Sequence, residues 1–108
     1  MAFITKEIEN YVVLQYNEDE RDRTALIHCL ADVGGYIGYL VFYKEGVPIP
    51  RSWKRSSGAP NLNFSERRFP EIMETLRQEK PVYIAFNDYS MRGMIKTSPE
   101  PVGEEEDE

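Results

Sequence analysis

The sequence is poor in the residues that carry most catalytic and metal chemistry. Its 108 residues include one cysteine, Cys29, and one histidine, His28. A lone cysteine excludes an internal disulfide and is typical of a reducing compartment. On a β-strand the side chains of neighbouring residues point to opposite faces, so these two cannot form a Cys–His dyad or share a metal. We therefore expect a non-enzymatic protein without metal or cofactor, with Cys29 buried and His28 in a core or interface.

Long hydrophobic runs are also lacking. No run approaches the length of a membrane span, and the first ten residues, MAFITKEIEN, lack the apolar core of a signal peptide. With the single cysteine, this predicts a cytoplasmic protein without a membrane partner. The composition, 41% hydrophobic and 12% aromatic, is typical of one folded domain.

The net charge of −6 is concentrated in the last residues of the chain. Six acidic residues stand there: Glu100, Glu104, Glu105, Glu106, Asp107 and Glu108. Removing these six from the 19 acidic residues leaves 13, which balance the 13 basic residues. Prolines, a glycine and a block of like charge cannot bury anything. The sequence predicts one globular domain, Met1–Thr97, followed by a disordered acidic tail, Ser98–Glu108.

Ala25–Tyr43, ALIHCLADVGGYIGYLVFY, predicts the central β-hairpin of the domain. Gly34 and Gly35 separate two apolar runs, and glycines can adopt the positive φ values of a tight hairpin turn. This turn would pair Val33 with Tyr36, Ala31 with Gly38, Cys29 with Leu40 and Ile27 with Phe42 on one apolar face. Thr24–Val33 could also carry a helical stripe, but the consistent pairing favours a strand.

The second face of the hairpin is mostly apolar as well, with Leu26, Leu30, Tyr39, Val41 and Tyr43. A sheet face exposed to water would be more polar, so this face needs a cover. The cover is a second sheet layer, a partner subunit or a ligand, and a half-open barrel is a further alternative. Because symmetric dimers are common, we predict a homodimer with these five residues at its interface.

The remaining pattern predicts further strands and one main helix. The apolar stripe Phe69, Ile72, Met73 and Leu76 and the early Pro70 predict a helix at Pro70–Glu79, and Ser65 is a candidate cap for a preceding turn. The other expected elements are, in order, a short edge strand or anchor at Phe3 and Ile4, a strand at Tyr11–Tyr16, a charged loop at Asn17–Arg23, an extended edge segment at Val47–Pro50, a mobile loop at Arg51–Asn61, a brief strand at Leu62–Phe64, and strands at Pro81–Asn87 and Gly93–Thr97 around a turn at Asn87–Arg92. The sum is an α+β domain whose twisted antiparallel sheet has about five to six strands, with the helix on one face.

A basic stretch, Arg51–Arg68, is the most suggestive functional feature. It holds Arg51, Lys54, Arg55, Arg67 and Arg68 against only Glu66, with Trp53 among the cations. Cations that follow a phosphate backbone, together with rings that stack on bases, are what single-stranded nucleic-acid binding requires. The alternative is a solvated basic loop, with Trp53 folded onto the sheet and the arginines paired with Glu71 and Glu74.

The order of elements over Tyr11–Thr97 resembles the layout of the PUR/Whirly type of single-stranded-DNA-binding folds. The resemblance covers the order only, matches no diagnostic motif and carries over no binding residue. The acidic tail is similar to that of bacterial single-stranded-DNA-binding proteins, although Glu108 stands where those have an apolar tip. The chain also resembles small uncharacterised bacterial proteins, which implies no activity. The expected function is a binding module for single-stranded nucleic acid, or alternatively a protein-interaction or assembly module that uses an apolar sheet face.

Overall fold

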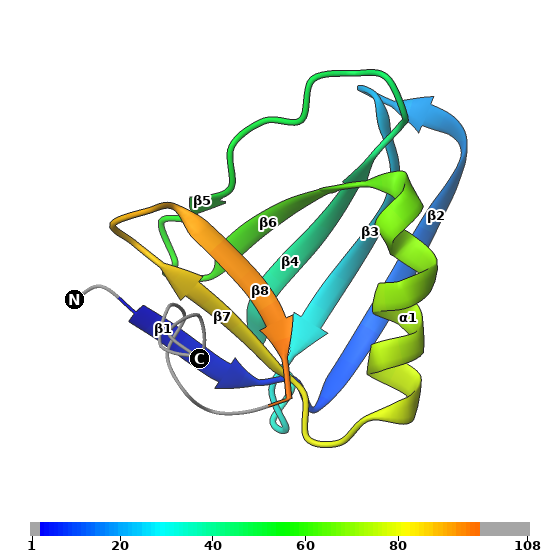
Figure 1. Ribbon diagram of the computed structural model, residues 1–108. Helices are drawn as coiled ribbons and strands as arrows, with labels where there is room; N and C mark the ends of the chain where they lie inside the picture. Colours follow the sequence, from blue (N-terminus) through cyan, green and yellow to red (C-terminus); the bar gives the residue numbers. More distant parts are fainter. Residues whose placement is uncertain (1–2, 98–108) are drawn as a thin grey trace, which may run out of the picture.

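The computed structural model describes residues 3–97, which form two β-sheets and one main helix (Figure 1). The strands are β1 (Phe3–Glu7), β2 (Asn10–Glu20), β3 (Arg23–Leu30), β4 (Tyr36–Tyr43), β5 (Trp53–Lys54), β6 (Pro60–Ser65), β7 (Tyr83–Asn87) and β8 (Arg92–Lys96). A 3-10 turn, η1 (Glu66–Arg68), leads into the helix α1 (Phe69–Gln78). The predicted α+β class is confirmed. The acidic tail predicted at Ser98–Glu108 lies outside the described residues.

The larger sheet has five strands in the order β2-β3-β4-β6-β5. All its pairings are antiparallel except that of β4 with β6, which is parallel. The expectation of a purely antiparallel sheet is therefore wrong at this pair. A parallel pair needs a long crossover connection. Residues 44–59 supply one, and they return the chain so that β6 runs alongside β4 in the same direction.

The central hairpin forms, but its register differs from the predicted one by two residues. Cys29 pairs with Gly38 and Ile27 with Leu40. The turn is the longer loop from residue 31 to 35, in which the Gly34 N–H donates to the Ala31 carbonyl at 2.9 Å and Gly34 has a φ of +93°. Because side chains alternate with a period of two, this shift leaves the residues of β3, and those of β4 from Gly38 onward, on their predicted faces. Tyr36 instead pairs with Leu30 across an irregularity in the register and lies on the opposite face from the one predicted. Val33, expected on the apolar face, is instead 92% exposed in the loop.

Two segments expected to be loops contain strand. Asn17–Arg23 continues β2 to Glu20 and turns tightly at Arg21 and Asp22, whose φ values are 53° and 68°. Its charged side chains suit the exposed end of an edge strand, where Lys44 Nζ lies 3.1 Å from the Asp19 carboxylate. The predicted mobile loop Arg51–Asn61 contains β5 and the start of β6, which pair through Trp53 and Asn61.

Val47–Pro50 was expected as an extended edge segment but is not a strand. The Asn63 side chain of β6 instead donates to the carbonyls of Pro50 and Arg51, at 3.1 and 3.2 Å. This part of the connection is therefore held by hydrogen bonds from a side chain and not by backbone hydrogen bonds to a neighbouring strand, because prolines have no N–H to donate.

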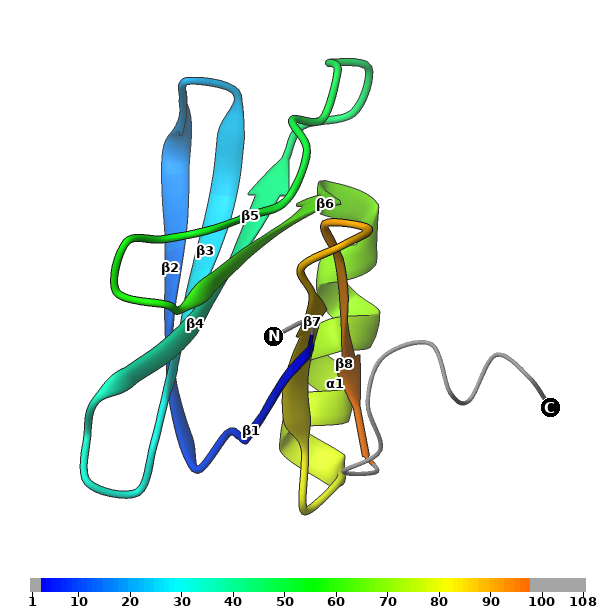
Figure 2. The same cartoon turned by 90° about the vertical axis from the view of Figure 1, so that its left-hand side faces the viewer.

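The smaller sheet has the order β1-β7-β8 and is antiparallel. This confirms an edge strand at Phe3 and Ile4, the strands around the Asn87–Arg92 turn, and the turn itself. Figure 2 shows that α1 and this sheet lie on the same side of the larger sheet. We call the covered side of the larger sheet its inner face and the opposite side its outer face.

The core lies between these two layers. From the larger sheet it receives Ile27, Leu40 and Phe42, and from the smaller sheet Ile84 and Phe86, all with no exposed surface. Ile84 packs directly on Gly38, where a Cβ atom would overlap its Cδ1. The inner face is thus covered by the helix and the second sheet together, so the second sheet layer does not cover the outer face.

The helix is confirmed within one residue of its predicted ends. Ile72 and Leu76 are buried in the core, and Phe69 and Met73 pack against it. Pro70 stands in the first turn, where its missing N–H costs no hydrogen bond. Ser65 caps the preceding 3-10 turn by accepting from the Arg67 N–H, as predicted.

Candidate interaction surface on the outer face

The outer face combines aliphatic and aromatic side chains that lie partly open to solvent. The register places on it Val12 and Leu14 of β2, Leu26, His28 and Leu30 of β3, Tyr39, Val41 and Tyr43 of β4, Asn61 and Asn63 of β6, and Trp53 of β5. Val12, Leu14 and Trp53 are 47%, 40% and 44% exposed. Native sheets bury large apolar side chains unless the surface has a partner. This face is therefore the candidate site.

An aromatic cluster lies at the end of this face near the 31–35 loop. The His28 ring stands edge-to-face against Tyr36 and Tyr39, with ring centroids 5.3 Å apart in both pairs. The guanidinium carbon of Arg55 lies 3.9 Å from the Tyr39 ring centroid and 5.3 Å from that of Trp53. We call His28, Tyr36, Tyr39, Trp53 and Arg55 the aromatic cluster. Strands β3, β4 and β5 and the turn after β5 bring these side chains together.

A chain of side-chain hydrogen bonds fixes Arg55 in this cluster. Arg55 donates to Asn61 Oδ1 at 3.0 Å, and Asn61 donates to Asn63 Oδ1 at 3.0 Å. Asn63 in turn donates to the carbonyls of Pro50 and Arg51. The Arg55 Nε atom is buried and has no hydrogen-bond partner among the described residues. The hydrogen bonds through Asn61 and Asn63 hold the guanidinium over Tyr39. Because Arg55 is already ordered, its binding to a partner costs less side-chain entropy.

The structure separates the six residues predicted to bind nucleic acid into three groups. Trp53 and Arg55 belong to the aromatic cluster on the outer face. Arg51 and Lys54 instead contact the β7–β8 turn, through the Ser90 carbonyl and the Asp88 carboxylate. Arg67 and Arg68 lie at the start of the helix, in η1, so the predicted basic surface is not continuous (Figure 1).

Most of these cations have partners within the chain. Lys54 Nζ lies 2.7 Å from the Asp88 carboxylate, and Arg68 pairs with Glu71 at 3.2 Å, as the sequence alternative anticipated. Arg67 lies 3.9 Å from the Glu45 carboxylate rather than near Glu74. Arg51 donates to the Ser90 carbonyl at 3.1 Å. Neutralised cations of this kind attract phosphates less than free ones.

The residues of the predicted dimer interface all lie on the outer face. Leu26, Leu30, Tyr39 and Tyr43 are half-buried, but Val41 is only 3% exposed. Val41 stands beside Asn63, whose side chain binds the 50–51 backbone. At Val41 the chain therefore already covers its own sheet, and this residue offers little surface to a partner.

Sequence reasoning missed three exposed members of this surface. Val12 and Leu14 alternate with Tyr11 and Val13, which pack on the core. The run of four apolar residues in this strand, YVVL, was the available signal, because a strand that is apolar on both faces has a packing partner on each of them. Tyr36 was assigned to the inner apolar pairing, and its contact with His28 depends on the irregular register next to Cys29, for which the sequence carries no signal.

The inner face at this point offers no reactive group. Cys29 is fully buried, as predicted, and burial raises the pKa of its thiol to about 12. A thiol with so high a pKa is a poor nucleophile at neutral pH. Among residues 3–97, no three His, Cys, Asp or Glu side chains gather in a way that could hold a metal ion.

Comparison with known proteins finds no family model, curated protein or solved structure that matches this chain. The resemblance in layout to the PUR/Whirly folds therefore stays a prediction. In the part of the chain that the structure describes, no helix is long and apolar enough to span a membrane.

Proposed function

We propose that this protein is a non-enzymatic protein-interaction module whose outer face contacts a partner protein. The observation that carries the proposal is the aromatic cluster, in which Arg55 is held between Tyr39 and Trp53. Tyrosine, tryptophan and arginine are the residues enriched where binding energy concentrates in protein interfaces. The exposed Val12 and Leu14 extend this cluster along β2 with apolar surface.

The balance of charge supports a protein partner over nucleic acid. Affinity for a phosphate backbone comes from cations that displace counterions. On this side of the molecule Lys54 is already engaged by the Asp88 carboxylate, and Arg67 and Arg68 lie at the start of the helix, away from the outer face.

A second copy of the chain is the first partner to test. Sheets pack face to face when both present apolar side chains, and a two-fold axis would bring two outer faces together. Sedimentation of the full-length protein at micromolar concentration should then show a dimer. A different protein on the same face is the other form of the proposal.

Photo-crosslinking tests the proposal in both forms. A benzophenone amino acid replaces Tyr36, which is 57% exposed in the aromatic cluster, or, as a control, Tyr89, which is 84% exposed in the β7–β8 turn. Irradiation in cells should link a protein to position 36 and not to position 89, and Trp53→Ala should abolish the link. Equal capture at both positions, or no capture at position 36, would contradict the proposal.

A second candidate function is the binding of single-stranded nucleic acid on the same face. The specific observation in its favour is the exposed Trp53 beside the guanidinium of Arg55, a pair on which bases could stack. Titration with labelled single strands should then show affinity that falls steeply with salt. Trp53→Ala should remove about 1–3 kcal/mol of binding free energy if a base stacks there. Absence of binding at low salt, also after deletion of Glu104–Glu108, would exclude this function.

A further inference from the structure

The smaller sheet has a free edge at β8. Its order is β1-β7-β8, and no strand among residues 3–97 pairs with the other side of β8. Natural edge strands are usually protected by a proline, a bulge, a covering element or charged side chains, and β8 carries charges only at its two end residues. The sequence of β8, RGMIK, contains no proline, and its register with β7 continues without a shift. This edge can therefore accept a further strand.

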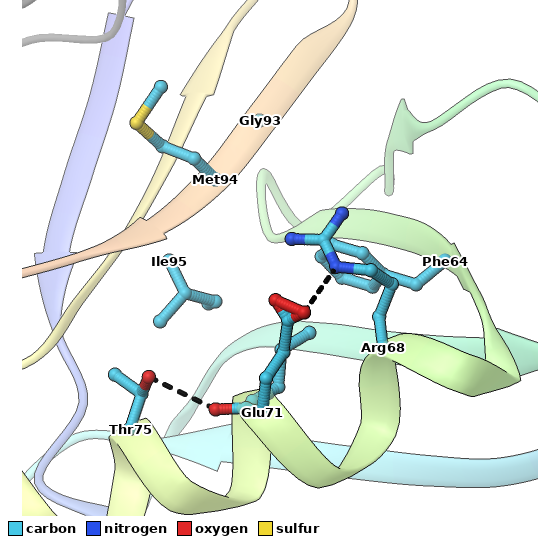
Figure 3. A pocket seen from close by; sticks show the side chains of 8 residues that line it. Phe64, Arg68, Glu71, Thr75, Gly93, Met94 and Ile95 are labelled. Carbon is cyan, nitrogen blue, oxygen red and sulfur yellow. Dashed lines mark hydrogen bonds and ion pairs between the residues drawn. The ribbon is translucent and has the colours of Figure 1, made fainter.

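A groove separates β8 from α1, so the helix does not close the edge. The groove has a volume of about 320 Å³ and is lined by Phe64, Arg68, Ile72, Thr75, Gly93 and Ile95, among others. Figure 3 shows Ile95 pointing from β8 toward the helix, with Thr75 on the opposite wall. The lining combines the apolar Phe64, Ile72 and Ile95 with the polar Arg68, Glu71 and Thr75, and β8 forms one side. We call this space the α1–β8 groove.

From this geometry we propose that the α1–β8 groove binds an extended, acidic peptide segment of a partner protein, which adds to β8 as a fourth strand. In β-strand addition the backbone hydrogen bonds supply affinity, and pockets for alternate side chains supply specificity. The site is separate from the outer face and does not depend on the function proposed for that face.

Charge complementarity specifies an acidic segment. Arg68 stands on the groove wall above the Phe64 ring, and β8 begins with the exposed Arg92 and contains no acidic residue. Among residues 3–97, the only carboxylate in the lining is that of Glu71, which Arg68 meets at 3.2 Å. Both of these side chains are more than half exposed, and an exposed pair of this kind is weak. A carboxylate of an incoming peptide can therefore recruit Arg68.

The chain offers a matched control for Arg68 on the same helix. Arg77 pairs with Glu74 at 3.5 Å with the same spacing and similar exposure, but it does not line this groove. Charge reversal at Arg68 and at Arg77 removes one exposed ion pair in each case. A glutamate is favourable at the helix N-terminus and unfavourable in the last turn, so the unfolding midpoint of both variants is measured as well. A difference in peptide binding between two folded variants then reports the groove.

The probe is a phage-displayed library of random decapeptides, selected on the full-length protein. Enriched peptides should combine carboxylates with apolar residues at alternate positions. A synthetic copy should bind about tenfold more weakly to Arg68→Glu, as expected from the loss of one charge-assisted hydrogen bond, and equally well to Arg77→Glu. Methylation of alternate peptide nitrogens should abolish binding, and amide NMR shifts should centre on residues 92–96.

Four results would overturn the proposal. The first is a selection that enriches no peptide sensitive to Arg68→Glu. The second is peptide binding that appears only after deletion of Ser98–Glu108, which would identify the chain's own acidic segment as the occupant. The third is a dimer of the full-length protein that Arg68→Glu dissociates, which would identify a second copy instead. The fourth is loss of binding by Tyr36→Ala but not by Arg68→Glu, which would assign the peptide to the outer face.

Discussion

Both faces of the larger sheet carry large apolar side chains, but the faces differ in what covers them. On the inner face Ile27, Leu40 and Phe42 have no exposed surface, because α1 and the smaller sheet pack over them. On the outer face, Leu14 of β2 is 40% exposed. An apolar strand therefore does not by itself reveal whether its cover comes from the same chain or from a partner.

The contrast extends to the kind of packing. The inner face uses aliphatic residues and phenylalanines that interlock with the opposite layer, for example Ile84 on Gly38. The outer face uses tyrosine, tryptophan, histidine and arginine, which carry polar atoms as well as apolar surface. Such side chains can hydrogen-bond to water in the free protein and still supply apolar surface to a partner. The following predictions test this division between a stability face and a binding face.

The largest expected effect compares two leucines on opposite faces. Leu40→Ala should lower the free energy of unfolding by roughly 2–5 kcal/mol, because it leaves a cavity in the core. Leu14→Ala removes the same atoms from the outer face and should cost less than about 1 kcal/mol. Urea denaturation measures both. Equal losses would mean that the outer face is as tightly packed as the inner one.

The helix allows the same comparison within one element. Leu76 is 8% exposed and contacts the core, so Leu76→Ala should cost roughly 2–5 kcal/mol. Glu74 is exposed, and Glu74→Ala should change the stability by less than about 0.5 kcal/mol. A comparable loss from both variants would contradict the assignment of the helix face.

The buried thiol of Cys29 makes the stability of the inner face depend on pH. Burial raises the pKa of Cys29 from 9.0 to about 12, so the folded state holds this proton more tightly than the unfolded state does. The resulting stability is complete below pH 9 and is lost as the pH rises toward 12, by up to about 1.4 kcal/mol per pH unit. Thermal denaturation from pH 8 to 11 should show a smaller decline for Cys29→Ala than for the wild type. Parallel declines would mean that the thiol ionises without unfolding.

A small effect on stability is expected at the aromatic cluster. Tyr36→Ala should change the free energy of unfolding by less than about 1 kcal/mol, because 57% of this residue is exposed. The same substitution should weaken partner binding by about 2 kcal/mol or more if Tyr36 is a hot spot. Tyr89→Ala should change neither quantity. Large destabilisation by Tyr36→Ala would make the cluster structural.

The local periodicities were sufficient to predict much of the fold. The stripe of Phe69, Ile72, Met73 and Leu76 determined the helix, and the alternation in β3 and β4 determined which residues enter the core. The parallel pairing of β4 with β6 was not predictable in this way. The sequence of a strand shows which of its faces is apolar, but not which strand lies next to it in the sheet. The same holds for the second sheet, whose strands β1 and β7 are distant in the sequence.

The candidate site was predictable only in part. Trp53 and Arg55 were predicted as site residues because they stand in a basic stretch of the sequence. Tyr39 was predicted as an interface residue because it lies on the second apolar face of the hairpin. Their grouping depends on β5, a two-residue strand inside a segment whose serines, glycine and proline resemble a loop. The sequence also could not show that Arg67 and Arg68 lie apart from the other cations, because residues close in sequence can point to different sides of the molecule. The predicted homodimer and cytoplasmic location stay predictions.

The pairing of β1 with β7 has a consequence for how the chain folds during synthesis. Residues 3 and 87 are cross-strand partners, so the smaller sheet cannot assemble until nearly all described residues have left the ribosome. Strands β2, β3 and β4 form a local meander that is available much earlier. Until α1 and β7 arrive, both faces of that meander are open, and a nascent chain in this state is exposed to aggregation. We expect a chaperone that recognises apolar strands to bind the nascent chain in this interval.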